Sequence, residues 1–380
     1  MSGRKGKGEG HIKKRSDGRW EARIYLADGR RKSFYAKTRA EVARLMREGL
    51  QNKDEGLAVL DHRQTLTKYL ESWLETVKYQ VRDSTWRRYS NHVRLHIIPQ
   101  LGKISLTKLT AQQVQAFYMR SLSSGLSSST VSSMHGTLHH ALEDALVLGL
   151  VTRNITGLAK RPRMVHREMN VLSVDEVRVL LESVADDRFE GVYFLALTTA
   201  MREGEIFALR WQDIDLEQGT VQVRMGVQEV YIQGKKRFDI RETKTVYSRR
   251  KIGLTKATIE ALKRHRARQE EESQALGEVW KNAHNLVFPN AVGGLMIPDN
   301  FVRRNYKRLL MKLGISSRVR FHDLRHTCAT LLLSRGVNVK VVSEMLGHSD
   351  IGITLRVYAH VLPHMQQSAV QEMEAMLGWD

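Results

Sequence analysis

The sequence has few residues that constrain a chain covalently, with one cysteine and five prolines among 380 residues. The single cysteine, Cys328, excludes a disulfide within the chain and fits a reducing compartment. No apolar run approaches the length of about 18 residues that a membrane-spanning helix needs, and no apolar signal segment follows the first residues. We therefore expect a soluble cytoplasmic protein that has no membrane partner.

Negative charge is also scarce, because 41 acidic residues stand against 61 Lys and Arg, which gives a net charge of +20. Such an excess repels itself unless a polyanion neutralises it, and nucleic acid is the leading candidate for that partner. The excess is greatest at the N-terminus, where residues 1–40 hold 13 basic and 4 acidic side chains and so contribute +9.

The N-terminal region has the pattern of a small antiparallel sheet backed by one helix. Strand-like alternation runs from His11 to Tyr35 and is interrupted by Asp-Gly pairs, which favour hairpin turns. Thr38 and Glu41 have the spacing of a capping box, and we expect the helix that follows to end near Glu48. The predicted strands span residues 10–15, 19–26 and 31–36.

Basic side chains are concentrated on these strands, and a strand face of this kind can lie in the major groove of DNA. The alternative is a basic hairpin whose Lys and Arg side chains are merely solvated. The predicted DNA-binding residues of this region are Lys13, Lys14, Arg15, Arg19, Arg23, Arg30, Arg31 and Lys32.

A helical region of four helices is expected over residues 64–160. The first begins after Thr65, and the second, residues 84–97, is expected to end at Pro99 and Gly102. A capping box at residues 110–113 begins the third helix, and Gly149 stops the fourth. The second helix directs three further predicted DNA-binding side chains outward, Arg87, Arg88 and Arg94.

A short stretch near the C-terminus, residues 321–360, holds four side chains suited to phosphoryl transfer: His322, Arg325, His348 and Tyr358. Apolar spacing predicts a helix that Gly336 stops and a second helix that starts at Asn338 and ends at Gly347, just before His348. Thr354 is expected to cap a third helix that carries Tyr358 in its second turn.

These residue types match the needs of a reaction at a phosphodiester. A Tyr hydroxyl is a weak nucleophile at its free pKa, and the charge on the non-bridging oxygens must be stabilised as phosphorus becomes five-coordinate. Arg and His side chains supply that stabilisation. The chain offers a second arginine, Arg202, in a turn between two predicted helices, and a candidate acid for the leaving oxygen, Lys244, between two strand-like runs.

Together these motifs resemble those of the tyrosine recombinases, and specifically the integrases of phages and other mobile elements. The matching positions keep the order and spacing of the family. They are Ala200, Met201, Arg202 and Glu205 of the first arginine motif, Lys244 of a hairpin, His322 and Arg325, the Leu-Gly-His-Ser element at residues 346–349, and Tyr358. The family commonly has Gly where this chain has Ala200.

The resemblance implies a mainly helical, multidomain α+β fold with small antiparallel sheets. Its domains would be an arm-type DNA-binding domain (1–55), a helical core-binding domain (64–160), a catalytic domain (170–365) with one small sheet, and a tail helix (366–380) packed on a neighbouring protomer. It also implies site-specific cutting and rejoining of DNA through a covalent 3′-phosphotyrosyl link, with no cofactor. The expected partners are duplex attachment sites of the core and arm types, three further copies of the chain, and accessory DNA-bending proteins.

Two alternatives stay open. One is a chromosome or plasmid dimer resolvase of the same family, and the other is a catalytically silent DNA-binding regulator. A zinc site also comes into question, because two histidine pairs, His322 with His326 and His135 with His139, have the i, i+4 spacing of helical zinc ligands. The accompanying Glu of such a motif is missing, so we predict no metal and expect His326 to pack or to bond locally.

Overall fold

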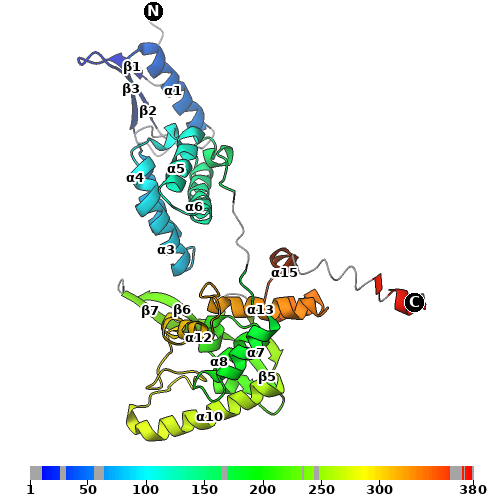
Figure 1. Ribbon diagram of the computed structural model, residues 1–380. Coiled ribbons are helices and arrows are strands. Elements are labelled where there is room, and N and C mark those ends of the chain that lie inside the picture. Colours follow the sequence, from blue (N-terminus) through cyan, green and yellow to red (C-terminus); the bar gives the residue numbers. More distant parts are fainter. Residues whose placement is uncertain are drawn as a thin grey trace, which may run out of the picture. The chain divides into compact units, whose positions relative to one another are not determined.

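The computed structural model describes residues 11–25, 31–54, 64–163, 169–232, 235–243, 248–359, 370–371 and 373–378 (Figure 1). The chain divides into two compact units, residues 1–166 and 167–380. In the described residues, helices dominate both units and every paired strand is antiparallel. This agrees with the predicted fold class. No helix in the described part of the chain is both long and apolar enough to cross a membrane.

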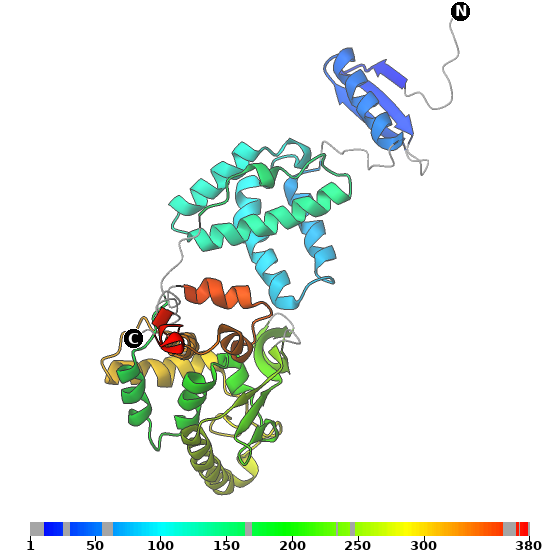
Figure 2. The same ribbon diagram turned by 90° about the vertical axis from the view of Figure 1, so that its right-hand side faces the viewer.

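The N-terminal region forms a three-stranded antiparallel sheet in the order β1-β2-β3, and Figure 2 shows one helix lying along a face of that sheet. Alternate residues of the strands, among them Ala22, Ile24 and Phe34, are buried together with Val42 of the helix. The helix runs further than the predicted end near Glu48. The elements are β1 (His11–Lys14), β2 (Trp20–Tyr25), β3 (Arg31–Ala36) and α1 (Arg39–Asp54).

The helical region has the capping groups that the sequence predicts. The Thr65 hydroxyl accepts from the N–H of Lys68 at 3.3 Å, and Thr110 and Gln113 form a reciprocal capping box. Hydrophobic stripes of the helices meet in one core. The helices are α2 (Leu66–Val77), α3 (Asp83–Asn91), a π-helical turn (His92–Ile97), α4 (Ile98–Leu101), α5 (Ala111–Ser123) and α6 (Ser128–Val147).

The prediction that Pro99 ends the second helix is wrong. The helical run continues from α3 through the π-helical turn into α4 and ends at Leu101, before Gly102. The N–H of Ile98 bonds back to the carbonyl of Val93, so a new α-helical turn begins just before the proline. At the start of a helical turn the missing N–H of proline costs no hydrogen bond, which explains why the chain continues.

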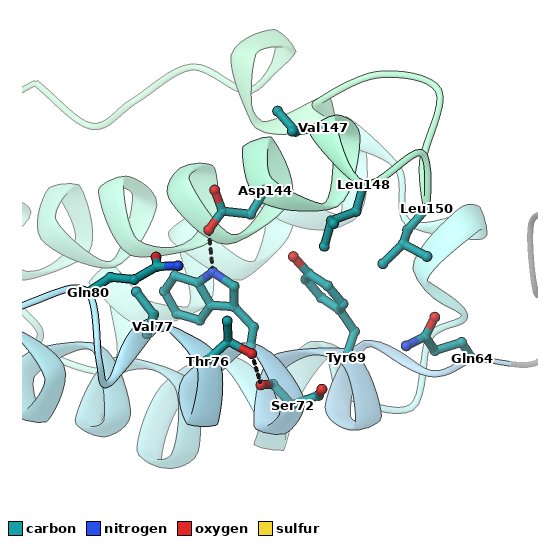
Figure 3. A pocket seen from close by; sticks show the side chains of 11 residues that line it. Gln64, Tyr69, Ser72, Thr76, Val77, Gln80, Asp144, Val147, Leu148 and Leu150 are labelled. Carbon is teal, nitrogen blue, oxygen red and sulfur yellow. Dashed lines mark hydrogen bonds between the residues drawn. The ribbon is translucent and has the colours of Figure 1, made fainter. Parts of the chain in front are cut away.

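A pocket of about 300 Å³ lies between α2 and the C-terminal end of α6 (Figure 3). Its wall includes Tyr69 and Trp73, and the indole N–H of Trp73 donates to a carboxylate oxygen of Asp144 at 2.6 Å. This bond ties α2 to α6 across the bundle. None of the predicted catalytic residues lines the pocket.

The second unit is built around α8, whose sequence is apolar on nearly every side and is therefore buried on nearly every side. It packs against α10 and α13. The helices of this unit are α7 (Val174–Ser183), α8 (Glu190–Thr199), α9 (Glu203–Phe207), α10 (Lys256–Leu276), α11 (Pro298–Phe301), α12 (Lys307–Lys312), α13 (Phe321–Ser334), α14 (Val339–Leu346) and α15 (Ile351–Tyr358).

The strands of this unit form two small sheets in the described residues, so the expectation of one sheet is wrong. One sheet has the order β4-β5-β8, and the other is a hairpin of β6 with β7. The chain changes sheets at Arg224, because the residues before it pair with β8 while those after it pair with β7. The strands are β4 (Ile214–Asp215), β5 (Thr220–Val223), β6 (Met225–Ile232), β7 (Lys235–Glu242) and β8 (Arg250–Gly253).

Candidate active site

Arg325 lies at the centre of the predicted catalytic residues, on the second turn of α13, and its side chain is only 3% exposed. Its guanidinium donates to the carbonyl oxygens of Ala200 at 2.6 Å and Leu346 at 2.5 Å, and lies 3.3 Å from Nε2 of His348. Burial, and then the charge of Arg202, lower the pKa of Arg325 to about 9, which leaves it charged at neutral pH. These three partners carry no negative charge, so a buried cation is held ready for an anion.

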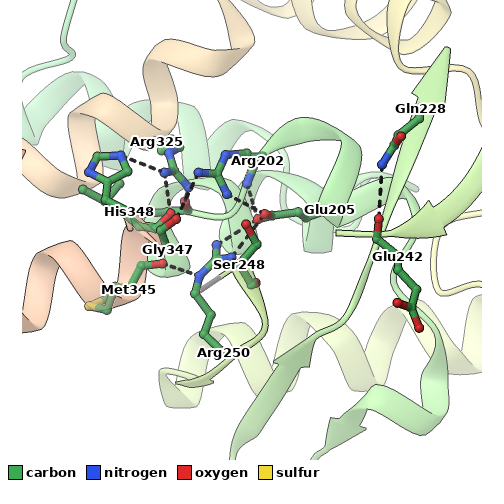
Figure 4. A network of polar contacts seen from close by, with 12 residues as sticks. Arg202, Glu205, Gln228, Glu242, Ser248, Arg250, Arg325, Met345, Gly347 and His348 are labelled. Carbon is green, nitrogen blue, oxygen red and sulfur yellow. Dashed lines mark hydrogen bonds and ion pairs between the residues drawn. The ribbon is translucent and has the colours of Figure 1, made fainter. Parts of the chain in front are cut away.

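Arg202 reaches the same place from the turn between α8 and α9, as predicted. Its backbone N–H and its guanidinium both donate to Glu205, at 2.9 and 2.8 Å, and the guanidinium also donates to the carbonyl of Gly347 at 3.3 Å. Figure 4 shows Glu205 between the guanidinium groups of Arg202 and Arg250. Burial would raise the pKa of Glu205, but hydrogen bonding and charge from Arg250, and then Arg202, lower it, so Glu205 stays ionised.

The turn that carries Arg202 depends on the left-handed backbone of Ala200, whose φ is 53°. This conformation favours glycine, because any Cβ crowds the backbone there. It gives a physical reason for the glycine that the related sequences commonly have. The small methyl group is tolerated, and Ala200 is buried with Arg325 bonded to its carbonyl oxygen.

Arg250 is a functional residue that sequence reasoning missed. Its guanidinium donates to Glu205 at 2.8 Å and 3.2 Å, while its Nε donates to the carbonyl of Met345 at 2.6 Å. It thereby joins β8 to the end of α14 and fixes the carboxylate that holds Arg202. One sequence signal was available, because strand alternation puts Arg250 on the same side of β8 as the buried Ile252.

His348 leaves α14 directly after Gly347, whose φ of 63° ends the helix as predicted. Its Nε2 faces the guanidinium of Arg325, and its Nδ1 lies 2.8 Å from the hydroxyl of Thr354. Since an arginine can only donate, Nε2 is the acceptor and Nδ1 carries the hydrogen. Burial, and then the charges of Arg325 and Arg202, lower the pKa of His348 to about 4, so this ring is neutral at pH 7.

The predicted role of Thr354 as a helix cap is wrong. The side chain of Asp350 accepts from the N–H of Gly352 at 2.9 Å and caps α15, so the helix begins earlier than expected. Thr354 is buried inside that helix, where it orients the ring of His348. Tyr358 consequently lies in the last turn of α15.

Tyr358 packs its ring in a small core with Cys328 and Leu346, and the side chain is only 1% exposed. Its hydroxyl lies 2.8 Å from Nδ1 of His326, on the same helix as Arg325. The rings of His326 and His322 have centroids 5.0 Å apart, and His322 is exposed. His326 therefore bonds to the predicted nucleophile across 32 residues, whereas the sequence analysis expected it to pack or to bond locally.

Four of the other five predicted catalytic residues thus lie around Arg325. The sixth, Lys244, lies outside the described residues. The other histidine pair with zinc-ligand spacing has different partners, because Nδ1 of His135 lies 2.7 Å from the hydroxyl of Tyr118 and Nδ1 of His139 lies 2.8 Å from that of Thr156.

Several predicted DNA-binding side chains are engaged in ion pairs within the protein. Lys13 and Arg23 both contact Glu21, Arg19 contacts Asp17, Arg15 contacts both carboxylates, Arg87 contacts Asp83 and Arg94 contacts Glu71. The pairs that Arg19, Arg87 and Arg94 make are exposed and contribute only about 0–1 kcal/mol each, so a phosphate can replace those carboxylates at little cost. The Glu21 carboxylate is buried, so its pairs with Lys13, Arg15 and Arg23 do not exchange as easily. Lys14, Arg31 and Arg88 are exposed and Lys32 is half-buried, whereas Arg30 lies outside the described residues.

The sequence was compared with known proteins. Residues 170–365 match the Phage integrase family, and residues 65–122 match the domain described as Phage integrase, N-terminal SAM-like domain. A tyrosine recombinase XerC-like protein of Caldanaerobacter subterraneus is 31% identical over 360 residues, which cover 90% of this chain and 91% of that protein. An integrase of Streptomyces ambofaciens is 29% identical over 385 residues, which cover 97% of each chain.

Solved structures share the fold at lower sequence identity. The Tn1549 transposon integrase in complex with a circular intermediate DNA superimposes with a TM-score of 0.69 at 19% identity, covering 82% of this chain and 99% of that one. A lambda integrase dimer bound to a COC′ core site gives a TM-score of 0.56 at 17% identity, covering 94% and 96%.

Proposed function

This chain belongs to the phage integrase family of tyrosine recombinases, site-specific enzymes that cut and rejoin DNA, and from this premise we propose that the residues around Arg325 are its active site. The observation that carries the proposal is a buried guanidinium whose hydrogen bonds reach two carbonyl oxygens and an imidazole. A cation in that position attracts a phosphate. The buried hydroxyl of Tyr358 lies beside His326, the residue that follows Arg325 on α13.

In the proposed reaction the Tyr358 oxygen attacks a DNA phosphorus, and the bond from phosphorus to the 5′ oxygen breaks. The product is a 3′-phosphotyrosyl link and a free 5′ hydroxyl. Arg202 and Arg325 stabilise the charge that develops on the non-bridging oxygens, His348 holds the Arg325 guanidinium in place, and His322 donates a further hydrogen bond. Lys244 protonates the leaving 5′ oxygen.

The covalent link conserves the energy of the phosphodiester, so religation to another strand needs neither ATP nor a metal. His348 is suited to its part because Thr354 fixes its ring and tautomer. Arg202 is suited because Glu205 holds its guanidinium while 37% of the side chain stays exposed. His348 and Arg202 are therefore oriented before the substrate arrives, and such preorganisation is the main source of electrostatic stabilisation in active sites.

The remaining parts of the chain are proposed to bind DNA and other copies of the protein. We assign arm-site binding to residues 1–55, core-site binding to residues 64–160, catalysis to residues 170–365 and contact with a neighbouring protomer to residues 366–380. The exposed apolar side chains of Val370, Met373 and Met376 support the last assignment. The working assembly would be a tetramer on two attachment sites, assisted by DNA-bending proteins.

The test uses a nicked attachment-site duplex, from which the short leaving strand diffuses away after cleavage and so traps the covalent adduct. The unmodified protein should form an adduct that survives denaturing electrophoresis, and Tyr358→Phe should form none. Tyr193→Phe is a matched control, because Tyr193 is similarly buried in the same unit but packs its ring against Phe301, Tyr306 and Phe321 instead of bonding to His326. An adduct formed by the Tyr358→Phe protein would overturn the proposal.

A further inference from the structure

The hydrogen bond between Tyr358 and His326 has no place in the reaction described so far. The proton on the attacking phenol must leave as its oxygen bonds to phosphorus, and Nδ1 of His326 lies 2.8 Å from that oxygen. We propose that His326 is a further catalytic residue, the general base that accepts the Tyr358 proton. This inference rests on the proposed function, in which Tyr358 is the nucleophile.

The fold puts His326 where such a base is needed. Residues four apart on a helix share one face, so His326 lies beside His322, and it directly follows the buried Arg325. The end of α15 brings the Tyr358 hydroxyl to that face from another segment of the chain. With the ring of Tyr358 only 1% exposed, bulk water has little access to the phenol, and a protein side chain must take its proton.

The charge state of the pair fits this direction of transfer. Burial raises the pKa of Tyr358, which keeps its phenol protonated at rest, and burial lowers the pKa of His326, which keeps its ring neutral. The charged groups that act on His326 are Asp323, Arg325 and Arg320, and the ring of His322 stands against it. A protonated phenol therefore donates to an unprotonated Nδ1.

The proposed step is balanced within the site. The phenolic proton moves to Nδ1, the bond from Oη to phosphorus forms, and the bond from phosphorus to the 5′ oxygen breaks. The leaving oxygen receives its own proton from a separate acid, for which Lys244 is proposed. In religation the incoming 5′ hydroxyl attacks the link, and the imidazolium returns its proton to the departing phenolate.

The first test compares His326→Asn with His326→Leu in single-turnover cleavage of the nicked site at saturating protein. The asparagine amide can hold the phenol by a hydrogen bond but cannot take its proton, whereas leucine can do neither. A general base contributes roughly 10²–10⁴-fold to such a step, so both variants should be slower by at least about 100-fold. If His326→Asn cleaves at close to the normal rate, His326 only positions the tyrosine. If His326→Leu cleaves faster than the unmodified protein, His326 restrains the tyrosine. Either result overturns the proposal.

The chain supplies a matched control in another histidine and tyrosine pair. Nδ1 of His135 lies 2.7 Å from the hydroxyl of Tyr118 in the helical region, with the same two atoms in contact. His135→Asn should therefore leave the cleavage rate within about 3-fold of normal. Melting temperature and affinity for the site are measured for all three variants, so that a folding defect is separated from a chemical one.

A second test distinguishes the two sides of the reaction. A bridging 5′-phosphorothiolate substrate has a leaving group that departs without a proton, so it relieves a missing acid but not a missing base. The His326→Asn defect should persist on this substrate with a similar fold-change. Rescue would assign His326 to the leaving group and overturn the proposal. If Tyr358→Phe still forms the adduct, the proposed function itself fails. If Tyr358→Phe is inactive but His326→Asn cleaves at the normal rate, only the role of His326 is refuted.

Discussion

Replacing Arg250 by methionine should destabilise the second unit, because Arg250 is the residue that joins β8, α9 and α14. Its side chain is 7% exposed and that of Glu205 is 5% exposed, so the pair lies in the interior. Methionine fills a similar volume but donates no hydrogen bond. Glu205 would then keep only Arg202, and the carbonyl of Met345 would lose the donor that lies 2.6 Å away.

The size of the effect follows from this burial. Removing one partner of a buried ion pair costs about 3–5 kcal/mol, and the remaining bond from Arg202 to Glu205 puts the expectation near the lower end, at about 3 kcal/mol. In a unit of this size, each kcal/mol lowers the melting temperature by roughly 2–4 °C. The expected decrease is therefore roughly 6–12 °C.

The assay is calorimetric unfolding of the full chain, with the neighbouring arginine as a matched control. Arg249 also pairs with a glutamate, Glu242, but these side chains are 50% and 70% exposed. Exposed pairs contribute at most about 1 kcal/mol, so Arg249→Met should shift the transition by no more than about 4 °C. Equal shifts for the two variants would refute the claim that Arg250 anchors the site.

Two further predictions concern charge and pH. Arg325→Lys should slow cleavage by roughly 10²–10³-fold with little loss of DNA affinity, because one ammonium cannot reach both carbonyl oxygens and a phosphate. Single-turnover cleavage rates and filter-binding titrations of the variant check this. A cleavage rate within 5-fold of that of the unmodified protein would contradict it. Burial lowers the pKa of His92 to about 4 in the folded protein, so as the pH falls the unfolded chain is protonated at this histidine before the folded chain is. The free energy of unfolding should therefore fall by roughly 2–3 kcal/mol as the pH drops from 6.5 to 4. Urea unfolding between pH 6.5 and 4 should show a smaller decrease in the free energy of unfolding for His92→Gln than for the unmodified protein. Equal decreases for the two proteins would contradict this prediction.

Features that depend on neighbouring residues were predictable from the sequence. The cap at Thr65 and the capping box of Thr110 with Gln113 are present, since both partners lie within one turn of the chain. The catalytic motifs were found for another reason, because their order and spacing match a family. Their convergence around Arg325 required the fold.

Features that depend on distant contacts were not predictable. Arg250 meets Glu205 across 45 residues, and His326 meets Tyr358 across 32, so no local pattern reveals either pair. Thr354 has a residue type that often caps helices, but Asp350 caps α15 by accepting from the N–H of Gly352. The hydroxyl of Thr354 instead bonds to the ring of His348. The second sheet was missed because the strand patterns do not show which strands pair, and the chain changes partners at Arg224.

The central claim is that the Tyr358 hydroxyl, buried beside Arg325, forms the covalent link to DNA. The most direct measurement is to trap the adduct on a nicked attachment site, digest both protein and DNA, and map the modified peptide by fragmentation mass spectrometry. The account predicts a nucleotide attached to Tyr358 through its phenolic oxygen. A nucleotide on any other side chain would contradict it.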